Sequence, residues 1–210
     1  MIDIHKIITS LQLKRPIFHS EADFQLAIAW EIQKLYPHVE IRLEYNYPKV
    51  FESLYLDVWI KFEGNYIPIE LKYKTKKSTF LVDGEQFSLK NHGAQDCGRY
   101  DFLKDISRIE KVIYTEESIS TGYAIMLTND SLYWRESNKI DSVDAAFKIH
   151  EGRKLSSQLS WGELASAGTK RGRENDIILE GSYSLNWTTF ANINNYPDSE
   201  FKILIVKVAK

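Results

Sequence analysis

Apolar residues recur at helical spacing in the first part of the chain. The earliest set predicts a short helix over residues 3–13 and comprises Ile4, Ile7, Ile8 and Leu11. A second helix is expected to begin after Ser20, which can cap its free amides, with Asp23 completing a capping box. Pro37 stops this helix. Its apolar residues, Trp30 among them, spread around most of the circumference, so we expect it to be buried.

The period of the pattern then changes from helical to two. Alternating apolar residues predict three strands, over 39–43, 54–62 and 67–73. After a poorly periodic stretch at 74–97, a third helix is predicted over 99–114 and a further strand over 122–127. Helix, three strands, helix and strand in this order predict an α/β fold, with a mixed β-sheet flanked by helices.

The pattern is less regular beyond residue 130. It predicts a short helix near 142–149, a polar loop over 150–176 and strands near 177–190 and 201–208. These late strands are expected either to extend the sheet or to form a small subdomain. With no linker or repeat in the sequence, residues 1–210 are interpreted as a single domain, in which 130–210 is a C-terminal extension.

Composition narrows the class of protein. The 210 residues include 27 Lys and Arg against 29 Asp and Glu, a net charge of −2, with 43% hydrophobic residues. This excludes a disordered, collagen-like or coiled-coil chain and argues against non-specific coating of nucleic acid, while leaving room for a local basic patch. Cys97 is the single cysteine, so an internal disulfide framework is excluded. No apolar stretch approaches a membrane span and no secretory signal is evident, which predicts a cytoplasmic protein without a membrane partner.

The second and third predicted strands form a hairpin that gathers charged residues. The apolar even positions of 54–62 are expected to share one face with the apolar odd positions of the next strand. A two-residue turn at 64–65 would place Asp57 opposite Lys72, with Glu70 diagonal to it. A wider loop would instead place Asp57 directly opposite Glu70. In either register the three charged side chains emerge together on the face opposite the apolar one.

Two carboxylates beside an ammonium group suggest a specific chemistry. Mg²⁺ is typically held by one or two carboxylates together with water and phosphate oxygens. A metal ion held by Asp57 and Glu70 would suit phosphodiester hydrolysis, with Lys72 stabilising the developing charge. The alternative is an ordinary solvated strand face with a cross-strand ion pair. In the helix over 99–114, Asp105 and Arg108 are expected to form an intrahelical ion pair.

The spacing of these residues resembles a known pattern. Asp57, then twelve residues, then Glu70-Leu71-Lys72 is similar to the motif of the PD-(D/E)XK phosphodiesterase superfamily, whose fold is called restriction-endonuclease-like. Leu56 stands where the proline of that motif would be, and proline itself does no metal chemistry. The resemblance covers about residues 18–127, which it marks as a nuclease-like core. It implies the α-β-β-β-α-β order and a metal-dependent nuclease that hydrolyses phosphodiester bonds.

The resemblance also implies roles for individual residues. Asp57, Glu70, the carbonyl of Leu71 and Glu21 would be the metal ligands, and Lys72 a catalytic group beside the catalytic carboxylates Asp57, Glu70 and Glu21. Glu21 belongs to this set because many members of the superfamily take an additional acidic residue from the helix before the first strand. As an alternative, Glu21 would serve only to stabilise the first turn of its helix. The expected cofactor is Mg²⁺, with Mn²⁺ as a substitute.

A run of lysines follows the motif. Lys74, Lys76 and Lys77 would bind nucleic-acid phosphates, although a charge run is usually a solvated face. The expected partner is nucleic acid, with DNA favoured over RNA, and a homodimer stays open. One alternative is a catalytically inactive module that keeps the fold and binds nucleic acid or protein. In another, the hairpin is structural and the last third of the chain binds a protein.

Overall fold

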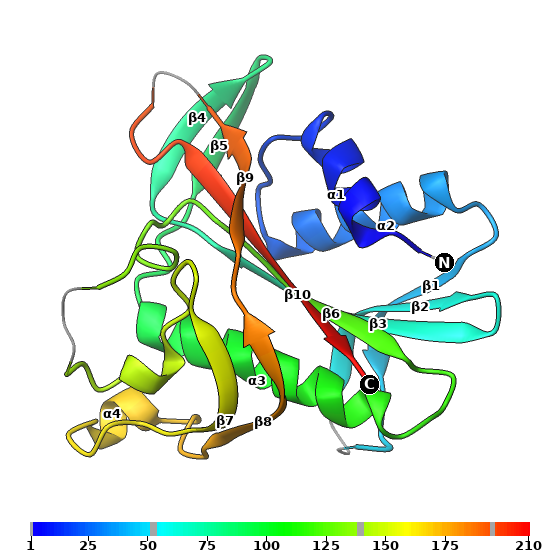
Figure 1. The fold of residues 1–210 in the computed structure, drawn as a ribbon. Coiled ribbons are helices and arrows are strands. Elements are labelled where there is room, and N and C mark those ends of the chain that lie inside the picture. Colours follow the sequence, from blue (N-terminus) through cyan, green and yellow to red (C-terminus); the bar gives the residue numbers. More distant parts are fainter. Residues whose placement is uncertain (1, 51–53, 138–140, 194–195) are drawn as a thin grey trace.

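The protein is a mixed α/β structure built around one large sheet. The computed structural model describes residues 2–50, 54–137, 141–193 and 196–210. Six of the described strands form the sheet (Figure 1), namely β1 (Glu40–Asn46), β2 (Tyr55–Phe62), β3 (Asn65–Lys74), β6 (Thr121–Thr128), β10 (Glu200–Ala209) and β9 (Trp187–Asn192), in that spatial order. β3 and β6 are parallel, and the other neighbouring pairs are antiparallel. The sheet is therefore mixed, as the sequence predicts.

Helices cover both faces of this sheet. α1 (Ile4–Gln12) and α2 (Glu21–Leu35) pack on one face, and α3 (Gln95–Ile113) packs on the other as the crossover between β3 and β6 (Figure 1). Each face has its own cluster of buried apolar side chains. No helix in the described part of the chain is long and apolar enough to cross a membrane.

The predicted start of α2 is confirmed, but its predicted burial is wrong in part. Ser20 is the N-cap, and its hydroxyl accepts a hydrogen bond from the Asp23 amide at 3.2 Å. Phe24 and Ile28 are fully buried against the sheet, whereas Trp30 is 66% exposed. The helix packs against α1 and the sheet, and Trp30 lies on its outer side.

Two stretches interpreted as irregular contain strands. Between β3 and α3, the hairpin of β4 (Ser78–Val82) and β5 (Glu85–Leu89) turns at Asp83-Gly84, where φ is +51° and +82°. An Asp-Gly pair in this conformation is a favoured hairpin turn, so this dipeptide was the available signal. The predicted loop over 150–176 contains β7 (Lys154–Leu159) and the short helix α4 (Ala167–Lys170).

The C-terminal third both extends the sheet and adds a small layer. β10 and β9 widen the sheet beyond β6. β7 pairs instead with β8 (Ile177–Ser184), and β8 packs against α3. The helix expected near 142–149 is limited to a 3₁₀ turn, Ala145–Phe147. Both expectations for the late strands are thus met. β9 and β10 extend the large sheet, and β7 and β8 form a separate two-stranded sheet.

Candidate functional site

The turn between β2 and β3 sets the register of the hairpin. Phe62 pairs with Asn65, so the turn is Glu63-Gly64, with φ of +51° and +78°. The predicted two-residue turn at 64–65 is therefore wrong. A turn with two positive φ angles favours glycine in its second position, which is where Gly64 lies. This register is the one that sets Asp57 opposite Glu70.

The backbone ladder between β2 and β3 ends just before these two residues. Its last pair is Val58 with Ile69. Beyond it, the Asp57 carboxylate accepts a hydrogen bond from the Leu71 amide through Oδ2 at 2.5 Å. The Asp57 side chain thus takes the position that the backbone of β2 would otherwise occupy, and the two strands separate around it.

This separation also corrects the predicted face of β2. Val58 and Ile60 pack in the cluster below α2, but Leu54 and Leu56 pack in the cluster around α3. The even positions of 54–62 therefore do not share one face. The alternation breaks at Asp57, where the regular pairing with β3 stops.

The side chains of Glu70 and Lys72 contact α3. The Lys72 ammonium lies 2.7 Å from Oδ2 of Asp105, and it donates to the Leu71 carbonyl at 3.1 Å. Arg108 lies 3.3 Å from Oε1 of Glu70 and 3.1 Å from Oδ1 of Asp105. Glu70 is only 2% exposed, because α3 covers this face of the sheet. The site is a buried charge cluster and not the solvated strand face of the alternative interpretation.

Two members of the cluster were not among the predicted site residues. The intrahelical pair between Asp105 and Arg108 is confirmed, but both side chains also bind the charged residues of β3. A signal for Asp105 was present in the sequence, since it lies among the apolar positions Phe102, Ile106 and Ile109 on the buried side of the helix. A charged residue within an apolar helical stripe needs a buried partner.

Glu21 lies beside this cluster at the start of α2. Its Oε2 accepts from the Tyr73 amide at 2.7 Å. Because amides two residues apart on a strand point the same way, Glu21 and Asp57 bind successive amides along one edge of β3. One turn later on α2, Gln25 donates to the Asp57 carbonyl at 2.7 Å. α2 is thus tied to both strands where they separate.

The crowding of carboxylates changes their proton affinity. Burial, followed by the charges of Asp105 and Asp57, raises the pKa of Glu70 well above its ordinary value. Burial also raises the pKa of Asp57, against the Lys72 charge, the Leu71 amide and a hydrogen bond with Glu70, which lower it. Burial disfavours the Lys72 ammonium, yet Asp105 and Asp57 outweigh it, so the pKa of Lys72 is raised.

The net charge of the cluster suits a divalent cation, but its side chains supply only part of a ligand set. When ionised, three carboxylates (Asp57, Glu70, Asp105) face two cations (Lys72, Arg108), an excess of one negative charge. Oε1 of Glu70 is buried and accepts no hydrogen bond. Two carboxylates suffice for Mg²⁺, which keeps several waters. Across the described ranges, however, no three His, Cys, Asp or Glu side chains group so as to hold a metal.

The structure therefore does not bring all four predicted metal ligands together. Asp57 and Glu70 lie together and the Leu71 carbonyl is adjacent, since it accepts from Lys72. Glu21 and Asp57 each accept from an amide of β3, but of these two only Asp57 also has a hydrogen bond with Glu70 in the described part of the chain. The oxygen set that fits Mg²⁺ is thus the Asp57 and Glu70 pair with the carbonyl.

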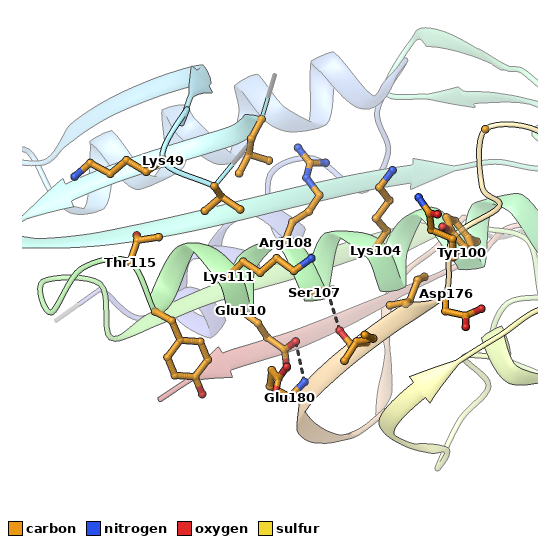
Figure 2. Close-up of a pocket in the computed structure, with 17 residues that line it drawn as sticks. Lys49, Tyr100, Lys104, Ser107, Arg108, Glu110, Lys111, Thr115, Asp176 and Glu180 are labelled. Atoms are coloured by element: carbon orange, nitrogen blue, oxygen red, sulfur yellow. Dashed lines mark hydrogen bonds between the residues drawn. The ribbon is translucent and has the colours of Figure 1, made fainter. Parts of the chain in front are cut away.

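The predicted phosphate-binding lysines lie further along β3 and beyond its end. Lys76 forms an ion pair with Asp198 at 2.9 Å, and both Lys76 and Lys77 are exposed. A different set of cations lines a groove of about 1080 Å³ beside α3 (Figure 2), and comprises Lys49, Lys104, Arg108 and Lys111. Arg108 belongs to both the groove and the charge cluster.

Comparison with known proteins gives no relative. No family model, no curated protein and no solved structure matches this chain. The function is therefore argued from the geometry of the site.

Proposed function

We propose that the protein is a metal-dependent nuclease of the PD-(D/E)XK type. The observation that carries this proposal is the convergence of Asp57, Glu70 and Lys72 where β2 separates from β3, with the Asp57 carboxylate on the Leu71 amide. Apart from the inserted β4 and β5 hairpin, the order of α2, three strands, α3 and β6 is similar to that of the restriction-endonuclease-like fold. Nucleic acid is the proposed substrate, with DNA favoured, and the proposed setting is the cytoplasm.

Each residue has a role in this proposal. Asp57, Glu70 and the Leu71 carbonyl would hold Mg²⁺, which supplies a Lewis acid for the phosphodiester when bound, and Mn²⁺ would substitute. The Lys72 ammonium, kept charged by its carboxylate neighbours, stabilises negative charge on the phosphate oxygens. Glu21 holds the end of β3 in place through the Tyr73 amide.

A second candidate function rests on Arg108. Its guanidinium lies 3.3 Å from Glu70 and thus supplies positive charge where a metal ion would. Asp105 is likewise shared between Lys72 and Arg108. This arrangement favours a catalytically inactive nucleic-acid-binding module, in which the arginine neutralises the carboxylates permanently.

Cleavage assays with matched variants test the proposed activity. With Mg²⁺ or Mn²⁺, the wild type is expected to cut labelled DNA, and Asp57→Asn and Lys72→Met are expected to abolish cutting. Lys61→Met is the control, since Lys61 pairs with Glu40 at 2.9 Å on the exposed surface of β1 and β2. Equal cleavage by all four proteins would refute the roles of Asp57 and Lys72.

A metal titration separates the active enzyme from the inactive module. A cation that binds only the folded state stabilises it by about 2.7 kcal/mol at 100 times its Kd. We expect Mn²⁺ to raise the melting temperature of the wild type but not of Asp57→Asn. A wild-type melting temperature that does not respond to Mn²⁺ or Mg²⁺, together with absent cleavage, would support the inactive module.

A further inference from the structure

The groove beside α3 carries an ordered stripe of cations. Lys104, Arg108 and Lys111 follow one another at i, i+4 and i+7, so they share one side of the helix. Figure 2 shows Lys104 and Arg108 pointing from α3 to the side of the groove on which Lys49 lies, and Lys111 running along the helix. The stripe is about 10 Å long, from the 1.5 Å rise per residue. That length matches a few consecutive phosphates of one strand.

The opposite wall of the groove has a different chemical character. It is formed by β8 and the residues before it, where Asp176 and Glu180 are exposed and Ile178 is 56% exposed. Tyr114 lines the groove from the end of α3 and is 63% exposed. Apolar and aromatic surface suits the faces of unstacked bases, and carboxylates can accept hydrogen bonds from base amino groups.

Because the cations lie on one wall of the groove and the carboxylates on the other, the groove favours a single strand of nucleic acid over a duplex. A single strand can turn its phosphates to the lysines of α3 and its bases to β8. A duplex would bring the phosphates of its second strand toward Asp176 and Glu180, which repel them. The Glu110 carboxylate adds to the negative charge of the β8 side, because it accepts hydrogen bonds there from the amides of Glu180 and Gly181 and from the Tyr183 hydroxyl.

We propose that this groove binds one strand of nucleic acid, with its phosphates against Lys104 and Lys111 and its bases against β8. The groove leads to the candidate site through Arg108, which lines it and lies 3.3 Å from Glu70. The inference deepens the proposed function and rests on it, because the bound strand would be the substrate of the proposed nuclease. Its test, however, measures binding without catalysis.

The test compares three double variants with the wild type. Fluorescence anisotropy of a labelled 20-nucleotide single strand, and of the same sequence as a blunt duplex, is followed in EDTA over about 50–200 mM NaCl, the range in which phosphate contacts change affinity strongly. The groove variant is Lys104→Gln/Lys111→Gln, and both lysines are exposed. Lys76→Gln/Lys77→Gln tests the lysine run after β3. Lys6→Gln/Lys34→Gln changes the charge equally on exposed positions of α1 and α2, which cover the other face of the sheet.

The expected results follow from counter-ion release. Each phosphate contact to a single strand contributes about 0.7 to the slope of log K against log salt, so losing two contacts lowers affinity about 25-fold at 0.1 M salt. We expect this loss only in the groove variant, and tighter wild-type binding of the single strand than of the duplex. Unchanged binding by the groove variant, a larger loss in either other variant, or preference for the duplex overturns the proposal.

This test is independent of the proposed cleavage. Binding in the groove without cleavage under any divalent cation would leave the inference standing and remove the nuclease. Cleavage that requires Asp57 but is unaffected in Lys104→Gln/Lys111→Gln, with unchanged binding, would keep the nuclease and remove the groove.

Discussion

The two faces of the large sheet differ in what they bury. On the face covered by α1 and α2, the strands contribute apolar side chains such as Val58, Ile69 and Leu71, each fully buried. On the face covered by α3, the same two strands bury or partly bury Asp57, Glu70 and Lys72, and α3 itself buries Asp105.

Buried apolar groups and buried charges contribute differently to the stability of the fold. Apolar burial stabilises a fold by roughly 25 cal/mol per Å² and requires no particular partner. A buried charge cluster is weak evidence for stability, because the cost of desolvation offsets much of the attraction. Both faces hold the fold together through their apolar clusters, and the α3 face in addition buries the charge cluster of the proposed function, at some cost in stability.

The largest effect is expected from a cavity on the α2 face. Phe24 is fully buried, with its ring centroid 5.0 Å from that of Phe18. Phe24→Ala is expected to lower the free energy of unfolding by about 3–5 kcal/mol. Urea unfolding measures this, with Trp30→Ala as the control because Trp30 is 66% exposed. Equal losses in both variants would contradict the assignment of the core.

Removal of the ammonium from the α3 face is expected to cost less, about 3 kcal/mol. Lys72→Met would leave Asp105 and Asp57 without their nearest cation. Urea unfolding of Lys72→Met and Asp105→Asn, with the double variant, closes a double-mutant cycle that isolates the pair. The double variant is expected to be less destabilised than the sum of the two single variants. Strict additivity would show that the ion pair contributes no coupling.

Glu70→Gln is expected to stabilise the protein at neutral pH. The pKa of Glu70 is raised in the folded state, so the folded protein binds more protons than the unfolded chain once the pH exceeds the ordinary pKa of 4.5. Wild-type stability therefore falls as the pH rises from there toward the folded pKa, and the variant lacks this loss.

Melting temperatures between pH 4 and pH 9 test this sign. The advantage of Glu70→Gln is expected to be absent near pH 4 and to grow with pH. A variant that is less stable than the wild type at pH 8 would show instead that attraction between Glu70 and Arg108 outweighs burial and repulsion.

The smallest effect is expected at the start of α2, where Glu21 accepts a hydrogen bond from β3. Glu21→Gln retains an oxygen that can accept from the Tyr73 amide, so its stability is expected to stay within about 0.5 kcal/mol of the wild type. Glu21→Ala removes the acceptor and is expected to cost about 1–2 kcal/mol. Equal stability of both variants by urea unfolding would show that the hydrogen bond is dispensable.

Local pattern predicted much of the fold and part of the candidate site. The α/β class, α2 with its Ser20 cap, the hairpin of β2 and β3, α3 and β6 all follow from residue periodicity and capping. The β4 and β5 hairpin was predictable from Asp83-Gly84 but was missed because the strands around it are short. β7 was missed because two of its six residues are buried, which leaves little apolar pattern to detect.

The sequence by itself determined that Asp57, Glu70 and Lys72 lie close together, because they belong to two strands joined by a short turn and either register of that turn brings them together. Tertiary structure alone decided that α3 covers these residues, adds Asp105 and Arg108, and opens a cationic groove beside them. Those contacts join residues more than thirty positions apart, and their geometry depends on how a helix crosses a sheet, which residue periodicity does not encode.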